Sequence, residues 1–474
     1  MLRDIIFSAM VLFMVPACYR KPFIGLVMFS WLAYMRPQDL TWGFAREQRW
    51  SYLIAVTTFL GFVKSRPTEW FLRDWRNYVM LLMIAVVGIS GAASKYASAI
   101  TFNHFMEFAK ILIIAMFTTV VVRKREQLRI LLWIIALSLG FYGVKSGIWG
   151  IMTLGRVAII RGPGGMMLDN NALALALAMA VPILVHLGLT ERHRLVKYAF
   201  LVSVPLCAFT VMLTHSRGGF LSLSCGLAVL VWHSRNRVAV ISAAMLLAVA
   251  AFILAPSEYK DRISTIADYE TEGSAQGRIR SWGIGYRMAM ANPVLGVGIE
   301  QYVYHYNDYA TEPGHGVIVA HNSFIQIWAE SGTISLILYL ALLASCFLMI
   351  WQVRARARHH FYTSWILNYC TMFEGCMVAF TVGGMFLNKA HFDLFYHMVA
   401  IILVFGRMAF AEMEDPVKYP LRDGNRGQIS FSQARLFGGK QISKSREFRD
   451  PQPAFGGRRT TQTLTTGTLK KRQS

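Results

Sequence analysis

Thirteen apolar stretches, separated by short polar segments, dominate the pattern of the chain. Most of them approach the roughly 20 residues that an α-helix needs to cross a bilayer. The first three are shorter, so we expect one or two of them to be re-entrant or interfacial. None alternates with a period of two, so the pattern favours helices over strands. The approximate limits are Ile5–Cys18, Phe23–Met35, Tyr52–Val63, Tyr78–Ser94, Phe105–Val122, Leu128–Ile148, Ala172–Leu189, Tyr198–Leu213, Gly218–Trp232, Val238–Ala255, Thr333–Trp351, Ser364–Phe386 and Leu394–Phe410.

This pattern predicts an all-α polytopic membrane protein with about 12 (12–13) transmembrane helices. Composition agrees, because 55% of the 474 residues are hydrophobic and only 16% are charged, against roughly 25% charged residues in an average soluble domain. These figures exclude a disordered chain and a disulfide scaffold. The net charge of +22 does not indicate a nucleic-acid partner, because such proteins carry basic charge on a polar folded surface.

Lysine and arginine clusters follow every odd-numbered apolar stretch up to the eleventh. Basic residues in short loops mark the cytoplasmic side, so we predict that all these loops are cytoplasmic. The tail from Ala411 holds 13 Lys+Arg and 6 Asp+Glu and is expected on the same side, largely disordered. Thirteen spans would then put the N-terminus outside and twelve would put it inside; the sequence leaves both open. The clusters include Arg20 and Lys21, Lys64 to Arg76, Arg123 to Arg125, Arg192 to Lys197, Arg235 and Arg237, and Arg354 to Arg358.

Four segments are predicted along the chain. Residues 1–255 hold the N-terminal transmembrane helices, 256–332 form one large periplasmic loop with short amphipathic helices, 333–410 hold the C-terminal transmembrane helices, and 411–474 form the basic tail. The large loop is net acidic, with 5 Lys+Arg and 9 Asp+Glu. Because the cytoplasmic loops hold charge clusters and the external loops hold isolated polar residues, we expect the chemistry on the external face.

His321 is the first candidate for that chemistry. Asn322 or Ser323 after it can cap a short helix whose apolar face includes Phe324 and Ile327, and Gly332 is expected to end that helix. The imidazole would then be held at the membrane surface, where a histidine can act as a general base near neutral pH. The alternative is a hydrogen-bonded interfacial histidine without a catalytic role.

Arginines in the external loops are candidate phosphate ligands. Arg217 lies beside Gly218 and Gly219 between the eighth and ninth stretches, and the guanidinium fork matches phosphate oxygens. Arg278 and Arg280 begin an amphipathic run that ends at Asn292-Pro293, so its apolar side can lie on the membrane. For each of these segments, simple snorkelling of the arginine to the membrane surface is the alternative interpretation.

Arg161 opens a Gly-rich segment, Gly162-Pro163-Gly164-Gly165, followed by Asp169-Asn170-Asn171 before the seventh stretch. Gly-rich backbone at a helix N-terminus can bind anions, although a turn with an Asx cap is the simpler interpretation. The acidic run of Asp268, Glu270 and Glu272 is expected to be a solvated loop. No CxxC pair occurs among the six cysteines, so we predict no metal site and no cofactor.

Several of these pieces, in this order, resemble the O-antigen ligase and polymerase superfamily of bacterial envelope glycosyltransferases. The single large loop before the last spans also matches, and the resemblance covers roughly residues 1–410 but not the tail. It is nearest to ligases associated with exosortase systems, through the stretch from Pro37 that ends in Leu40-Thr41-Trp42-Gly43-Phe44. The motifs are Asp169-Asn170-Asn171, Ser216-Arg217-Gly218, Gly277-Arg278 to Trp282, and His321-Asn322 followed by Gly332.

The resemblance implies transfer of a glycan from undecaprenyl pyrophosphate to an acceptor at the periplasmic side of the inner membrane. For an O-antigen ligase, the acceptor is a hydroxyl of lipid A-core. The resemblance implies that His321 is the general base and that Arg217 and Arg278 hold the pyrophosphate; we add Arg161 and Arg280 because of their charge. It implies an inverting, metal-independent reaction, in which arginines stabilise the departing pyrophosphate in place of a divalent ion. The expected partners are the lipid-linked O-antigen, lipid A-core and membrane lipids.

Three alternatives remain open. An O-antigen polymerase would use another lipid-linked repeat unit as acceptor, and a protein O-oligosaccharyltransferase would modify a Ser or Thr of a protein. A polytopic transporter, from a different class, would show related halves and broken helices at mid-membrane, and no clear internal repeat is present.

Overall fold

The computed structural model describes residues 1–65, 74–96, 98–234, 236–238, 241, 273–311 and 316–421. Twelve of the thirteen predicted stretches coincide with helices there. The tenth stretch, Val238–Ala255, lies almost wholly outside the described residues, as do the acidic run from Asp268 to Glu272 and the tail from residue 422. The elements are α1 (Leu2–Arg20), α2 (Pro22–Tyr34), η1 (Pro37–Leu40), η2 (Phe44–Arg46), α3 (Trp50–Lys64), α4 (Trp75–Ala92), α5 (Ala99–Val121), α6 (Arg125–Met152), β1 (Arg161–Gly164), β2 (Met167–Asp169), α7 (Asn170–Thr190), α8 (Arg194–Leu213), α9 (Arg217–His233), α12 (Gly273–Ala291), η5 (Tyr306–Asp308), α13 (Ser323–Arg358), α14 (Ser364–Gly384) and α15 (Asp393–Met413).

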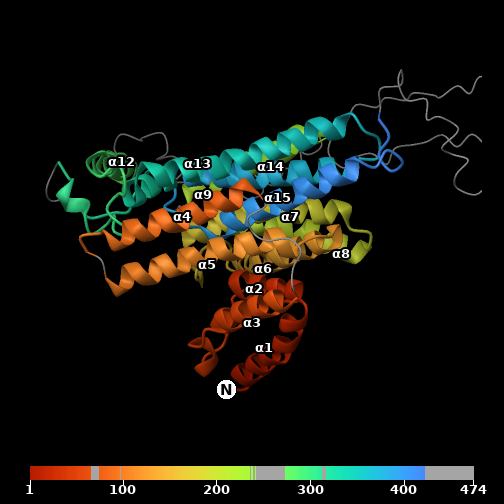
Figure 1. Ribbon diagram of the computed structural model, residues 1–474, viewed down its shortest axis with the longest axis horizontal. Helices are drawn as coiled ribbons and strands as arrows, with labels where there is room; N and C mark the ends of the chain where they lie inside the picture. The colour runs from red at the N-terminus through yellow and green to blue at the C-terminus, as the bar shows by residue number, and fades with distance from the viewer. Residues whose placement is uncertain are drawn as a thin grey trace, which may run out of the picture.

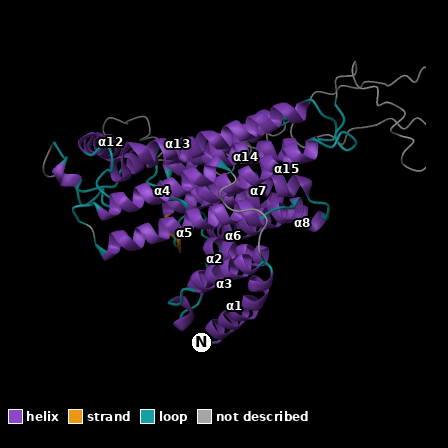
Figure 2. Cartoon of the chain, in the orientation of Figure 1, coloured by secondary structure: helices purple, strands orange, loops and turns teal. Residues whose placement is uncertain are grey.

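A bundle of long apolar helices forms the main body, as Figures 1 and 2 show. Nine helices of the described ranges are long and apolar enough to cross a membrane, which confirms the predicted all-α polytopic class. Helix α7 is the most enclosed of these nine helices, because 89% of the residues in its most apolar 18-residue segment are buried. Its Ala- and Leu-rich sequence explains this position, because small side chains let neighbouring helices approach closely. Helices α6, α8, α9 and α14 pack around it.

The first three helices form a separate unit beside the bundle, below α5 and α6 in Figure 1. They share a hydrophobic cluster that includes Phe7, Leu32 and Trp50. Helices α2 and α3 have only 13 and 15 residues, as their short apolar stretches predicted. The Asp4 carboxylate of α1 accepts hydrogen bonds from the amides of Gly43 and Ala45, at 2.9 and 3.3 Å. The start of α1 therefore lies at the same end of this unit as the loop between α2 and α3.

The predicted short elements of the loops are present. Helix α12 covers the amphipathic run and ends at Ala291, just before Asn292-Pro293. Helix α13 begins after Asn322 and is interrupted at Gly332, whose φ of 79° and ψ of 177° are not helical. Residues 323–331 are thus a short leg that precedes the long span, as the sequence predicted. The Gly-rich segment after Arg161 forms a two-stranded hairpin, β1–β2, rather than a simple turn.

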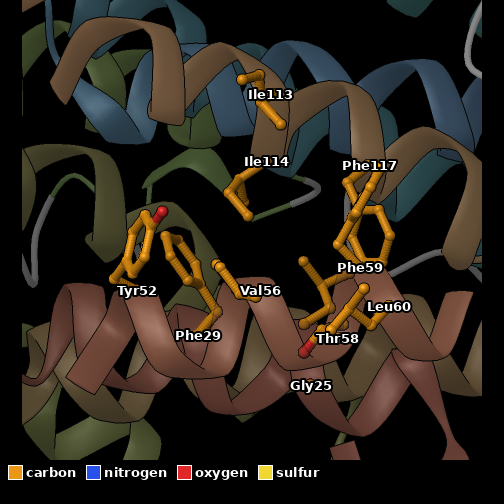
Figure 3. Close-up of a pocket in the computed structure, with 12 residues that line it drawn as sticks. Gly25, Phe29, Tyr52, Val56, Thr58, Phe59, Leu60, Ile113, Ile114 and Phe117 are labelled. Atoms are coloured by element: carbon orange, nitrogen blue, oxygen red, sulfur yellow. The ribbon is translucent and has the colours of Figure 1, made fainter. Parts of the chain in front are cut away.

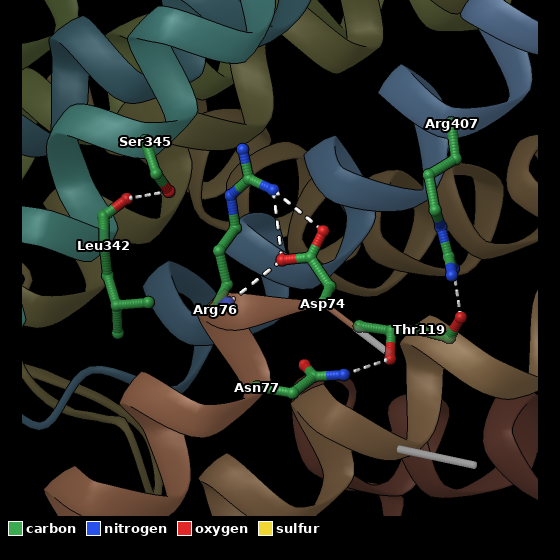
Figure 4. Close-up of polar contacts among 7 residues, drawn as sticks. All are labelled: Asp74, Arg76, Asn77, Thr119, Leu342, Ser345 and Arg407. Carbon is green, nitrogen blue, oxygen red and sulfur yellow. Dashed lines mark hydrogen bonds and ion pairs between the residues drawn. The ribbon is translucent and has the colours of Figure 1, made fainter. Parts of the chain in front are cut away.

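Buried polar contacts tie the helices together at the end of the bundle where α4 begins and where α5 and α15 end (Figure 4). Asn77 of α4 donates to the hydroxyl of Thr119 at 2.9 Å, and Arg407 of α15 donates to the Thr119 carbonyl. The segment after α15 also returns to this end, where the Phe361 amide donates to the Pro420 carbonyl at 2.8 Å. Residues 414–421 therefore pack on the turn that follows the basic end of α13.

Candidate functional site

Three helices of the bundle begin at one place. Asp169 caps α7, Ser216 caps α9 and Asn322 caps α13, each by accepting amide hydrogen bonds from the first helical turn. The starts of α7 and α9 are joined directly, because the Ser216 hydroxyl donates to Oδ1 of Asn171 at 2.7 Å. Helix N-termini carry partial positive charge and unsatisfied amides, so their convergence favours an anion.

The loop between α14 and α15 joins the start of α13 to this place. The Ser323 hydroxyl donates to the Leu387 carbonyl at 2.8 Å and accepts from the Lys389 amide at 3.0 Å. One helical turn later, Oε1 of Gln326 accepts from the Ala390 amide at 3.0 Å. These contacts hold the backbone of Lys389 against the first turns of α13.

Lys389 and Asp169 form an ion pair across the site, with 2.6 Å between Nζ and Oδ2. Burial would raise the pKa of Asp169, but the Lys389 ammonium and the amides of Ala172 and Asn171 outweigh it and hold that pKa below its usual value. Asp169 is therefore ionised near neutral pH, and its charge is balanced by Lys389. The sequence predicted the Asx cap at Asp169 but not this partner.

His321 lies half-buried directly before the cap of α13, with a left-handed φ of 48°. Its pKa is lowered from the ordinary value, first by burial and then by the positive charge of Arg278; Asp169 opposes this shift and Lys389 adds to it. The imidazole is therefore neutral at physiological pH, as a general base must be. Arg278, Asp169 and Lys389 are therefore close enough for their charges to act on His321.

The four predicted arginines are placed differently around His321. Arg278 in α12 is half-buried and its charge acts on His321. Arg217 is the exposed first residue of α9, next to the Ser216 cap. Arg161 is exposed on β1, where it pairs in register with Asp169. Arg280 is half-buried but lies about 200° around α12 from Arg278, so it points away from the side that faces His321.

A residue outside the predicted set supports the hairpin. Arg36, in the loop after α2, forms an ion pair with Asp39. A Cβ atom on Gly165 would clash with the Arg36 guanidinium, and one on Gly164 would come within 2.9 Å of the Asp39 carboxylate. The φ angles are positive, 116° at Gly164 and 53° at Gly165, and L-residues with side chains rarely adopt such values. The hairpin therefore rests on this ion pair.

One group of side chains in the described part of the chain has the composition of a metal site. Glu300, Glu330 and His391 bring their ligand atoms within 4.8 Å of one another. Nδ1 of His391 lies 3.5 Å from Oε1 of Glu300. Burial alone would raise the pKa of Glu300. The hydrogen bond with His391 and the charge of His391 outweigh burial, so this pKa lies below its usual value. Glu300 and His391 therefore interact electrostatically, and the expectation of a metal-free site remains a prediction.

An apolar cavity of about 250 Å³ lies between α2, α3 and α5, lined by side chains such as Phe29, Val56 and Ile114 (Figure 3). Its surface is almost entirely hydrocarbon, and no charged side chain is among the residues that line it. The sequence-predicted site residues are not among those that line it.

The fold and the site together define a multi-pass membrane protein in which helix N-termini and basic side chains gather at one end of the bundle. A family model described as O-antigen ligase matches residues 201–340, and a model of a family of unknown function matches residues 2–193. This match confirms, for residues 201–340, the resemblance to O-antigen ligases drawn from the motifs. None of the curated proteins compared with it matches.

The two matched segments divide the site between them. His321, Arg217, Arg278 and Arg280 lie in the segment matched by the ligase family. The hairpin with Arg161 and the cap Asp169 lie in the segment matched by the family of unknown function. The segment matched by the family of unknown function thus contributes Asp169, whose charge acts on His321.

Proposed function

We propose that this protein is an O-antigen ligase, an inverting and metal-independent glycosyltransferase that moves a glycan from undecaprenyl pyrophosphate to a hydroxyl of lipid A-core. The observation that carries this proposal is the placement of His321 with its lowered pKa among three helix N-termini and the Arg278 guanidinium. A neutral base next to an anion site is what a hydroxyl nucleophile and a pyrophosphate leaving group require.

In the proposed reaction, His321 takes the proton from the acceptor hydroxyl while that oxygen attacks the anomeric carbon of the donor sugar. The bond between this carbon and the pyrophosphate oxygen breaks, and the electron pair leaves with undecaprenyl pyrophosphate. Attack opposite the leaving group inverts the anomeric configuration. Arg217 and Arg278 hold the pyrophosphate and stabilise its growing charge, with Arg161 as an additional ligand.

We further propose that the site faces the periplasm, that the protein is in the bacterial inner membrane and that its C-terminal tail is cytoplasmic. The basic clusters support this orientation. The contact of residues 414–421 with the turn after α13 supports it as well, because that turn follows Arg354, Arg356 and Arg358.

The test is a reconstitution of the purified protein with a lipid-linked glycan and, separately, lipid A-core, a candidate acceptor protein, or no further acceptor. Transfer to lipid A-core supports the ligase. Modification of the acceptor protein would instead assign the activity of a protein O-oligosaccharyltransferase. Elongation of the lipid-linked glycan would assign that of a polymerase. Movement of the glycan across the membrane without any transfer would indicate a transporter.

His321→Asn tests the role of the base in the same assay. Asparagine tolerates the left-handed backbone of residue 321, so the change removes the imidazole with little backbone strain. We expect a loss of roughly 100-fold to 10,000-fold in the rate of transfer, the usual contribution of a general base. His359→Asn, in the exposed turn after α13, is the matched control and should retain full activity. Normal transfer by His321→Asn would refute the assignment.

A further inference from the structure

Lys389 is the one lysine or arginine between α14 and α15, and neither family match reaches it. Its backbone is fixed by two hydrogen bonds: the Lys389 amide donates to the Ser323 hydroxyl, and the neighbouring Ala390 amide donates to Oε1 of Gln326. A lysine on a loop tip would normally lose much side-chain freedom on binding an anion. Here the backbone of the loop is already ordered by its hydrogen bonds to the first turns of α13, so anion binding requires less additional ordering.

The Lys389 side chain is also held at its far end. Oδ2 of Asp169 lies 2.6 Å from Nζ, and Asp169 is itself held by the Ala172 amide at 2.9 Å. An ammonium group has three donors, and the carboxylate takes one of them. The Lys389 side chain is 20% exposed and that of Asp169 is 44% exposed, so the pair borders open space.

The charge of Lys389 acts on both His321 and Glu300. Its ammonium is paired with Asp169 at the start of α7, and its backbone amide donates to the hydroxyl of Ser323, two residues after His321. Arg278 lies on α12, whereas Lys389 lies on the loop between α14 and α15. The charges of two cations from different elements thus act on the imidazole.

We propose that Lys389 is a binding residue for the pyrophosphate of the lipid-linked donor, with Asp169 as the residue that positions its ammonium. This inference rests on the proposed function, because it names a further ligand of the same donor. The ammonium keeps its bond to Asp169 and donates its remaining protons to phosphate oxygens. Arg217, Arg278 and Lys389 then contact the anion from three elements, and the leaving group departs with its charge neutralised from several sides.

The experiment measures initial transfer rates of the full-length protein against the concentration of lipid-linked donor. For Lys389→Met, we expect the KM for the donor to rise roughly tenfold to a hundredfold, the loss of one charge-assisted hydrogen bond, with a smaller change in kcat. Lys389→Arg should restore most of the affinity, and Asp169→Asn should raise the KM less than Lys389→Met does. Lys95→Met, an exposed lysine in the loop between α4 and α5, is the matched control and should behave as wild type.

A merely structural role predicts a different result. It would lower kcat and thermal stability with an unchanged KM for the donor, and Lys389→Arg would not rescue it; either of these outcomes overturns the proposal. Wild-type kinetics in Lys389→Met would overturn it as well.

Direct binding of lipid-linked pyrophosphate and of inorganic pyrophosphate separates this inference from the proposed function. If the wild-type protein transfers glycan to no acceptor but binds the lipid-linked pyrophosphate in a manner that Lys389→Met weakens, the function falls and the binding role stands. If transfer proceeds and Lys389→Met binds as tightly as wild type, the binding role falls alone. Weakened binding of the lipid-linked form and of inorganic pyrophosphate by the same factor supports a contact with the phosphates themselves.

Discussion

The charges around His321 set the pH range in which its imidazole is neutral. Burial and Arg278 lower its pKa, and Asp169 raises it. A general base is active only above its pKa, so a lowered pKa lets transfer continue into more acidic solution. Of the charged groups that act on the ring, Arg278 and Lys389 therefore lower the pKa of His321 and Asp169 raises it.

Arg278→Gln should move the acidic limb of the pH–rate profile to higher pH, because the loss of a nearby positive charge lets the pKa of His321 rise. Asp169→Asn should move the same limb to lower pH, because the charge that stabilises the imidazolium is removed. The profile of kcat/KM, recorded with purified protein, reports the free enzyme.

Arg156→Gln is the control for this pair, because Arg156 is exposed in the loop that follows α6, and it should leave the limb in place. Shifts of Arg278→Gln and Asp169→Asn in the same direction would contradict the assignment of His321 as the titrating base.

Sequence patterns could identify His321, Arg217 and Arg278 because each lies in a short local motif. They could not identify the partner of Asp169, because Lys389 is 220 residues away in the chain. The sequence offers only a weak signal for it, a single lysine in the short segment between the last two apolar stretches. Pairing across the site depends on the packing of α7 against α14, which no local pattern encodes.

At the level of elements, the interruption of α13 positions the histidine. Gly332 has a positive φ of 79°, and a Cβ atom there would clash with the backbone carbonyl of Val294. The amides of Val297 and Gly298 also donate to the carbonyls of Ala329 and Glu330, at 3.0 and 2.8 Å. The short leg that starts beside His321 is therefore packed on the segment that follows α12.

Gly332→Ala should disturb this contact and with it the position of His321. We expect a free energy cost of at least about 1–3 kcal/mol from backbone strain alone, a lowered thermal midpoint in detergent, and a large loss of transfer. Gly316→Ala is the matched control, because a Cβ atom there meets nothing within 4 Å. An unchanged midpoint and unchanged activity in Gly332→Ala would show that the leg tolerates another backbone conformation.

The extents of the helices follow from the apolar pattern, and so do the caps at Asp169 and Asn322. The hairpin β1–β2 was not predicted, because its Gly-rich strands lack the apolar alternation of a normal strand. Its conformation depends instead on Arg36 and Asp39, which lie more than 120 residues earlier in the chain. The local pattern therefore predicts where elements begin and end, while the shape of this loop is set by tertiary contacts.

At the level of the whole molecule, the start of α1 and the candidate site share one end. Asp4 contacts the loop between α2 and α3, and Arg36 of that loop contacts the hairpin that leads to Asp169. This arrangement favours the thirteen-span alternative, with the first residues on the same side as His321. The sequence could not decide this, because the orientation of three short helices depends on their packing.

Cysteine substitution tests this topology. Leu2→Cys and Gly316→Cys should react with a membrane-impermeant maleimide from the same side, and Lys418→Cys only from the other. Five of the six native cysteines are buried, so background labelling should be low, and the unsubstituted protein measures it. Labelling of Leu2→Cys from the side of Lys418→Cys would favour twelve spans.

The division of the site between two matched segments has a consequence for inheritance. His321 and Arg278 come from one segment and Asp169 from the other, and the charges of Arg278 and Asp169 both act on His321. A recombination event near residues 193–201 would separate groups whose charges act on one another, even though it falls outside the site. We therefore expect the two segments to be inherited as one unit, and hybrids of distant relatives joined there to fold as membrane proteins without an effective base.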